Sequence, residues 1–414
     1  MPGIVERPKI IEEALEQFAD LFQNKCQRDH FANYLTGLMV GNNKTVTGIT
    51  DEIVGASDQS CLNRFLTEVD WDENELNHRR IDWLREQGDI VNHPLASIAI
   101  DNVLIDHDGK FIKDVGWFWD HSEQRHKIAH DYLFVNYVNQ NGKHYPLDFR
   151  RFKKKNQCEQ TDEKFINHTE LFIELVDWCQ EEKFLGTFVF DSYFSSGKIL
   201  NHINSLYDAR GERRGYVGDL KSNRTITFKG QSMSAAAFAA SIDKGAKKQI
   251  IHKNGKKQWY FTVTVGVSEA DHKCRIVFLW DKPGDTEPKK ILITNKTNWE
   301  INRIIGTYRD RWTGTETFHR DGKQELGMGD CQLRSGLGQT RHMILVMLAY
   351  SLAMRCLGNV SLSEWAFHKL KTVGEVCRAM LDETFRGTIM WVLDQIGVDG
   401  GKRTRKLLKR LRLV

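Results

Sequence analysis

The fold is decided by the stretch Phe188-Val189-Phe190-Asp191-Ser192-Tyr193-Phe194-Ser195-Ser196. Its first three residues are apolar and predict a short buried strand, which ends at the carboxylate of Asp191. Ser195-Ser196-Gly197 then predicts the start of a helix with a serine as N-cap. A carboxylate at the end of a central strand lies where α/β sheets usually bind their ligands. Asp191 is therefore a candidate site residue, and the alternative interpretation is that it only caps the turn.

The segments that precede this strand complete the outline of a core. Residues 96–106 predict an apolar strand that is interrupted by Asp101, and residues 132–138 predict a second strand. Asn141-Gly142 is typical of a hairpin turn into a third strand. A helix predicted for residues 162–182 leads into the Asp191 strand. Antiparallel strands, a helix and then a strand parallel to the first are the order expected of an RNase H-like core, so the fold class is α/β.

The rest of the chain divides by its pattern of apolar residues. Helical spacing dominates the first 90 residues and most of the chain after Thr297, whereas residues 201–296 predict mainly strands. The expected division is a helical N-terminal domain (1–92), the first part of the RNase H-like core (93–200), a β-rich insertion (201–296), the second part of the core (297–358) and a helical C-terminal region with a basic tail (359–414). In the N-terminal domain, two short helices joined at a small-residue turn permit a DNA-binding helix-turn-helix, and a plain helical bundle is the alternative.

Composition argues against a secreted or membrane protein. The eight cysteines are scattered without a CxxC pair, which indicates reduced thiols in a cytoplasmic protein. No signal peptide is visible at the N-terminus. The most apolar run, Met343 to Met354, is shorter than the ~20 residues that a membrane-spanning helix needs. We therefore expect this run to be a buried helix and expect no membrane partner.

Positive charge is concentrated in two regions. The last 14 residues contain seven Lys or Arg and no acidic residue, and without them the net charge of +4 would become −3. Residues 205–260 contain twelve Lys or Arg against four Asp or Glu. Such regions favour a polyphosphate partner such as DNA. A solvated surface with a basic tail is the alternative.

Three carboxylates stand out because each lies at the end or in the middle of an apolar element: Asp101, Asp191 and Glu316. Burying carboxylates together is costly unless a cation neutralises them. Oxygen ligands without His or Cys select hard cations, here Mg²⁺ or Mn²⁺. Two such ions can activate water on one side of a phosphodiester and stabilise the leaving oxygen on the other. If the three residues meet in the fold, they predict a metal-dependent phosphodiesterase site.

These residues resemble the DDE motifs of IS4-type insertion-sequence transposases, most closely those of the IS701 group. The catalytic pattern appears as Ile100-Asp101-Asn102, as Phe190-Asp191-Ser192-Tyr193-Phe194, and as Tyr308-Arg309-Asp310-Arg311-Trp312 followed by Glu316-Thr317-Phe318-His319-Arg320-Asp321-Gly322-Lys323. Flanking patterns of the group appear as Tyr34-Leu35-Thr36-Gly37-Leu38, as Leu326-Gly327-Met328-Gly329-Asp330-Cys331-Gln332-Leu333-Arg334-Ser335, and as Arg341-His342. The likeness therefore extends over most of the chain.

The resemblance implies an enzyme, a substrate and a set of site residues. Asp101, Asp191 and Glu316 would be the catalytic residues and the ligands of two Mg²⁺ or Mn²⁺ ions. The DNA-binding residues would be Tyr308, Arg311, Trp312 and Lys323. The protein would cut DNA at the terminal inverted repeats of a transposon and join the exposed 3′-OH to target DNA, as a homodimer assembled on double-stranded DNA. It would be a cytoplasmic, nucleoid-associated protein of a prokaryote.

One departure from the family pattern concerns the residues between Arg311 and Glu316. The family usually has three residues there, whereas this chain has four: Trp312, Thr313, Gly314 and Thr315. An additional residue turns an α-helix by about 100°, so Arg311 and Glu316 share a face only if the helix bulges or breaks, for which Gly314 is suited. Two alternatives to an active transposase stay open. One is an inactive or domesticated copy that only binds DNA, and the other is a stand-alone nuclease with the same core.

Overall fold

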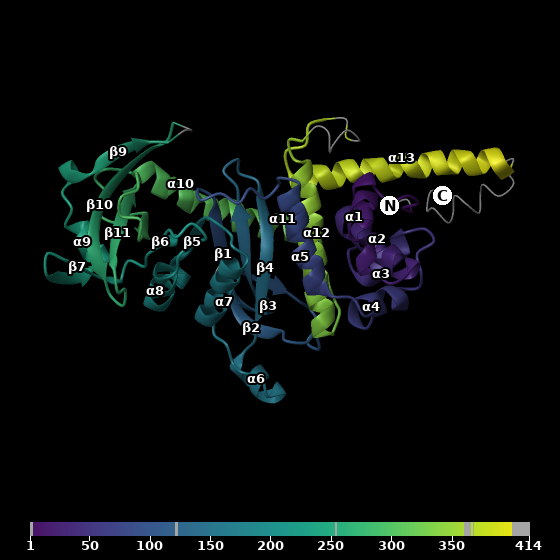
Figure 1. Cartoon of the computed structure of the whole chain (residues 1–414), viewed down its shortest axis with the longest axis horizontal. Coiled ribbons are helices and arrows are strands. Elements are labelled where there is room, and N and C mark those ends of the chain that lie inside the picture. Colours follow the sequence, from purple (N-terminus) through teal and green to yellow (C-terminus); the bar gives the residue numbers. More distant parts are fainter. Residues whose placement is uncertain (1–2, 121–122, 253–254, 360–365, 367, 400–414) are drawn as a thin grey trace.

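The computed structural model describes residues 3–120, 123–252, 255–359, 366 and 368–399, and the side chains of residues 396–399 are not described. Within these residues, twelve strands form one mixed sheet that runs through the molecule. Figure 1 shows an elongated molecule, with the strands β7 and β9–β11 at one end and the helices α1–α4 at the other. The RNase H-like core lies between these two ends. The basic tail predicted from the sequence lies outside the described residues.

The core sheet has the strand order β4-β3-β1-β5-β6, in which the first three strands are antiparallel and β5 and β6 are parallel to β1. A further strand, β2, pairs with the first residues of β3. The core strands are β1 (Ser97–Asp106), β2 (Gly116–Asp120), β3 (Arg125–Val138), β4 (His144–Phe152), β5 (Thr187–Phe190) and β6 (Gly215–Asp219). This mixed sheet with flanking helices confirms the α/β, RNase H-like fold class.

Helices cover both faces of the core sheet, as the side-chain alternation of β5 requires. Successive residues of a strand point to opposite faces. Phe188 and Phe190 belong to the main hydrophobic core, and the ring of Phe190 contacts that of Phe172 in α7 (His168–Glu181). Val189 belongs instead to a second cluster, together with Ile304 of α10 (Ile301–Arg311). The helix α8 (Gly197–Ser205) packs beside α7. Strand β5 is thus buried on both faces.

The predicted β-rich insertion is continuous with the core sheet. Strand β12 pairs with β6, and the sheet continues through β11 and β10 to β7 and β8, with β9 on the edge of β10. Strand β6 falls inside the segment predicted as the insertion, yet it pairs with β5 of the core. The elements are β7 (Thr225–Phe228), β8 (Gln231–Ser234), α9 (Ala235–Ala240), β9 (Lys248–Ile251), β10 (Lys257–Val267), β11 (Lys273–Trp280) and β12 (Lys290–Thr294).

The remaining elements are mostly helical. They are α1 (Lys9–Phe18), α2 (Lys25–Val40), α3 (Val46–Glu52), α4 (Gln59–Thr67), α5 (Glu73–Glu86), α6 (Lys155–Thr161), α11 (Thr317–Glu325), α12 (Gly336–Cys356) and α13 (Val373–Asp399). Short 3₁₀ turns cover Ala19–Leu21, Ser192–Phe194 and Lys244–Ala246, and a π-helical turn covers Trp312–Glu316. The π-helical turn joins α10 to α11.

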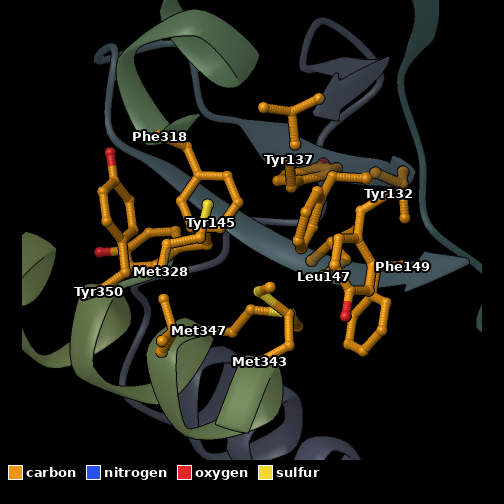
Figure 2. Close-up of a cluster of buried hydrophobic side chains, with 14 of the residues drawn as sticks. Tyr132, Tyr137, Tyr145, Leu147, Phe149, Phe318, Met328, Met343, Met347 and Tyr350 are labelled. Carbon is orange, nitrogen blue, oxygen red and sulfur yellow. The ribbon is translucent and has the colours of Figure 1, made fainter. Parts of the chain in front are cut away.

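Helix α12 connects the core sheet to the N-terminal helices. Helix α12 contacts β4, and Figure 2 shows Met343, Met347 and Tyr350 of α12 in one buried cluster with Tyr145 and Phe149 of β4. Its other sides contact α2, α4, α5 and α13. A helix that is apolar all round is expected to be buried, and the buried state of residues 343–354 confirms the sequence prediction. Within the described part of the chain, no helix has the length and apolar character to span a membrane.

Candidate active site

A cavity of about 950 Å³ opens at the point where β5 ends while β1 continues. Strand β5 pairs with Ser97–Ala99 of β1 and stops at Phe190, so the following residues of β1 border the cavity. Asp101, Asp191 and Glu316 all line it. The fold therefore brings together the three carboxylates that the sequence singled out, although they are separated by up to 215 positions in the chain.

Asp101 lies in the middle of β1 and is 7% exposed. Its side chain faces the π-helical turn, where Arg311 binds its Oδ2 and the Thr315 hydroxyl lies 3.5 Å from the same oxygen. Its Oδ1 accepts a hydrogen bond of 3.0 Å from the backbone N–H of Asn102. A carboxylate in the middle of an apolar strand thus has a cation as its principal partner.

Asp191 caps a turn and also lines the cavity. It caps the short helical turn Ser192–Phe194, because its Oδ1 accepts a hydrogen bond of 2.8 Å from the backbone N–H of Tyr193. It also lines the cavity. A carboxylate has two oxygens that together accept several hydrogen bonds, so the cap leaves acceptor capacity for a ligand.

Glu316 is the last residue of the π-helical turn. Its Oε1 lies 3.5 Å from Nη1 of Arg311, and its side chain is 39% exposed. A π-helical turn forms hydrogen bonds between residues five apart, as the bond from the N–H of Thr317 to the carbonyl of Trp312 shows. This wider turn brings Arg311 and Glu316 to the same side in spite of the additional residue between them. The bulge that the sequence required is therefore present.

Gly314 permits this turn because it has no Cβ, and not through the freedom of its backbone angles. The backbone angles flanking the turn are right-handed, and Gly314 is absent from the described residues with positive φ. Its importance is close packing: a Cβ atom at this position would lie 2.7 Å from Val138 and 3.1 Å from Ala99. The hydroxyl of Thr315 also donates a hydrogen bond of 2.7 Å to the carbonyl of Arg311, and such bonds to the preceding turn often bend helices.

The surroundings of Asp101 in the cavity disfavour the ionised form of its carboxyl group. Burial raises the pKa of its carboxyl group to about 7; the guanidinium of Arg311 opposes this rise, while the negative charges of Asp191 and Glu316 add to it. The three carboxylates are thus close enough to repel one another, and Arg311 alone does not compensate for burial and repulsion. An additional cation would stabilise the ionised form.

Replacing Asp101 by asparagine is expected to stabilise the metal-free protein at pH 8 by on the order of 2 kcal/mol. The pKa of about 7 in the folded state lies above the usual 3.8. The stability that this group contributes is therefore present below about pH 4 and is lost as the pH rises through 7. The advantage of Asp101→Asn over the wild type should be smaller at pH 5 than at pH 8. Urea unfolding in EDTA measures both values, and equal differences would contradict the assignment.

With this geometry in place, comparison with known families is informative. The family model described as DDE superfamily endonuclease matches residues 17–236, just over half of the chain. The chain belongs to this family. A second model, described as transposase DDE domain, matches residues 161–352. No curated protein sequence matches the chain. Together the two family matches imply a nuclease-type enzyme of the DDE transposase kind that acts on DNA, and such families generally use divalent metal ions.

The donor set of this DDE endonuclease suits a divalent metal in its chemistry. Asp101, Asp191 and Glu316 offer only oxygen atoms, which hard cations such as Mg²⁺ and Mn²⁺ prefer. Within the described ranges, however, no three His, Cys, Asp or Glu side chains are already grouped as a metal-binding cluster. Arg311 binds Asp101 instead. Metal binding by these three residues therefore requires their side chains to rearrange and Arg311 to release Asp101.

The structure places the four predicted DNA-binding residues differently from one another. Arg311 and Lys323 line the cavity. The ammonium of Lys323 donates a hydrogen bond of 2.7 Å to the carbonyl of Leu104, and burial lowers its pKa. Trp312 is 62% exposed but does not line the cavity. Tyr308 is half-buried and packs against the second hydrophobic cluster. Arg311 and Lys323 are thus positioned beside the carboxylates, and the aromatic pair is not.

Several residues that line the cavity were not predicted as site residues: Asn102, Asp131, His168, Tyr193, Lys221 and Arg320. Asp131 lies in the buried stretch of β3, directly before the strand predicted for residues 132–138, and is 4% exposed. Its place at the edge of an apolar run is a weaker signal than that of Asp101. Asn102, Tyr193 and Arg320 belong to the motifs quoted above, whereas His168 and Lys221 have no local signal in the sequence.

Proposed function

We propose that this DDE endonuclease is a cut-and-paste DNA transposase of the IS701 group. The proposal is supported above all by Asp101, Asp191 and Glu316, which line one cavity together with Arg311 and Lys323 in the order of the family motifs. The protein would hydrolyse one strand at each transposon end. The exposed 3′-OH would then attack a phosphodiester of target DNA. One P–O bond forms, the P–O3′ bond of the target strand breaks, and the released oxygen takes up a proton to become a new 3′-OH.

Asp101, Asp191 and Glu316 are the proposed metal ligands and catalytic residues. Bound Mg²⁺ or Mn²⁺, as two ions, would supply activation of the attacking oxygen and stabilisation of the leaving oxygen. Asp101 is positioned by its strand, and its carboxylate accepts a hydrogen bond from the N–H of Asn102. Asp191 is held by the turn that it caps. Glu316 is more exposed than either, because it ends the π-helical turn. The chain itself forms no covalent bond to DNA in this scheme.

Basic residues around the carboxylates would bind phosphate. Arg311 would exchange its contacts with Asp101 and Glu316 for contacts with the DNA backbone, since its fork of N–H donors suits phosphate oxygens. Lys323 lies on the same wall and would bind a neighbouring phosphate. Trp312 and Tyr308 remain proposed DNA contacts, and the exposed ring of Trp312 suits stacking on a base.

Surfaces outside the cavity would bind the transposon ends and the target DNA. The helices of residues 1–92 are the proposed binding domain for the terminal inverted repeats, and the protein would act as a homodimer once it is assembled on DNA. Basic side chains of the segment 205–260, such as Lys248, which is exposed on β9, would contact the DNA backbone. Such contacts would be independent of base sequence and weakened by salt.

The experiment that tests this function uses linear DNA carrying both flanks of the gene, with Mg²⁺ or Mn²⁺ and a plasmid target. Cleavage at two defined ends followed by their covalent joining to the plasmid is the expected result. Cleavage without joining would identify a stand-alone nuclease instead. Binding of the flanks without cleavage in either metal would identify an inactive copy.

A further inference from the structure

A second polar cluster, Asp131 and His168, lies in the wall of the same cavity. Nε2 of His168 and Oδ2 of Asp131 are 2.7 Å apart. The other carboxylate oxygen of Asp131 accepts a hydrogen bond of 3.1 Å from the side-chain amide of Asn102. Asp131 is only 4% exposed. A buried carboxylate with both oxygens engaged is a rigid acceptor, and it fixes the hydrogen of the imidazole on Nε2.

The ring of His168 is also held from two sides. It stacks on Phe152, with centroids 3.9 Å apart and an angle of 22° between the planes. The ring of His168 also meets the ring of Tyr193 in an edge-to-face arrangement, with the centroids 5.6 Å apart. The imidazole therefore has a fixed position and orientation, which is typical of residues that position a substrate. Its second nitrogen, Nδ1, has no hydrogen-bond partner among the residues that the structure describes, and the side chain is 17% exposed.

His319, the other histidine in the cavity wall, has different surroundings. Burial lowers its pKa to about 3, and the positive charges of Lys323 and Arg311 lower it further. It is therefore neutral at physiological pH and adds no positive charge to the cavity. His168 instead pairs through Nε2 with the carboxylate of Asp131, which leaves Nδ1 without a partner in the described part of the chain. Of the two histidines, His168 is the one whose ring is oriented by a carboxylate and has a nitrogen left for a ligand.

We propose that His168, oriented by Asp131, binds a backbone phosphate of the DNA strand that enters the cavity, next to the phosphate that is cut. The inference rests on the proposed DNA-cleaving function. In this arrangement Nε2–H donates to Asp131 and Nδ1–H donates to a phosphate oxygen. His168 begins α7, whose N-terminus adds a favourable dipole for an anion. Asp131 acts only through His168 and is a positioning residue.

The test compares His168→Ala with a matched control, His202→Ala. His202 forms an equivalent pair, with Nε2 2.6 Å from Oδ1 of Asp177 between α8 and α7, but neither residue lines the cavity. DNA binding would be measured by fluorescence anisotropy in EDTA over a series of salt concentrations, with circular dichroism as a check of folding. His168→Ala is expected to bind about tenfold more weakly and to reduce the slope of log affinity against log salt by about one. His202→Ala should match the wild type.

Two further variants separate a DNA contact from a merely structural role. His168→Lys keeps a cation at the position and should restore the salt slope, whereas Asp131→Asn should lower affinity with His168 still present. Wild-type affinity and slope in His168→Ala would overturn the inference. Wild-type binding with slower cleavage would also overturn it, because that result assigns His168 to proton transfer. A wild-type protein that neither binds nor cuts DNA would refute the proposed function itself, which is a distinguishable outcome.

Discussion

Replacing Asp191 by alanine is expected to abolish DNA cleavage while leaving DNA binding in EDTA intact. The side chain lines the cavity with Asp101 and Glu316, and the three are the proposed ligands of the catalytic metal. Loss of a ligand removes several kcal/mol of transition-state stabilisation, which corresponds to a rate lower by ~10³-fold or more. Single-turnover cleavage of end DNA with Mg²⁺ measures the loss, and the same result is expected for Asp101→Ala and Glu316→Ala.

Glu325 provides the matched control for these variants. It is another carboxylate of the same region and lies in α11, two residues after Lys323. Unlike Glu316, it does not line the cavity. Glu325→Gln should therefore cut DNA at the wild-type rate. Full cleavage by the Asp191→Ala protein, or loss of cleavage in Glu325→Gln alone, would show that the carboxylates have been assigned wrongly.

Replacing Gly314 by alanine is expected to destabilise the protein by about 1–3 kcal/mol and to reduce cleavage strongly. The added Cβ would lie 2.7 Å from a methyl group of Val138 and 3.1 Å from Cβ of Ala99. Both neighbours belong to core strands and are buried, so the π-helical turn must shift instead. That shift would move Glu316 and Arg311 relative to Asp101. Thermal unfolding and cleavage assays on the same preparation measure the two effects.

Gly306, in α10, provides the matched control for Gly314→Ala. A Cβ at this position of α10 would meet no atom within 4 Å. Gly306→Ala should therefore stabilise the protein by about 0.5–1 kcal/mol, since alanine has the higher helix propensity. Similar unfolding temperatures for Gly314→Ala and the wild type would mean that the turn adapts without strain, and the close packing of Gly314 would then not be what holds the site together.

Much of the core could be predicted because its signals are local. The apolar run that ends at Asp191 and the apolar run that Asp101 interrupts both reflect burial on a regular strand. The two residues accordingly mark a strand end and a strand middle in the structure. The burial of α12 followed from an apolar run without charges. Asp131 lies directly before the strand predicted for residues 132–138, and only the longer β3 of the structure places it inside a strand.

Other features depend on which distant segments meet. Strand β6 lies inside the segment predicted as the insertion, and it pairs with β5 on one side and with β12 on the other. The pair of Asp131 and His168 joins β3 to the start of α7, residues 37 positions apart. Tyr308 and Trp312 are both aromatic and lie four residues apart, about one helical turn. Nevertheless, Tyr308 is half-buried and Trp312 is 62% exposed.

The sequence by itself determined the fold class, the order of the motifs that contain the three carboxylates and the need for a bulge between Arg311 and Glu316. Only the tertiary structure decided that the bulge is a π-helical turn, that a Cβ at position 314 would press on Val138 and Ala99, and that Arg311 binds Asp101. The physical reason is that apolar periodicity and helix caps depend only on residues that are close together in the sequence. The contacts of a site depend instead on strand register and close packing between elements, which exist only once the chain has folded.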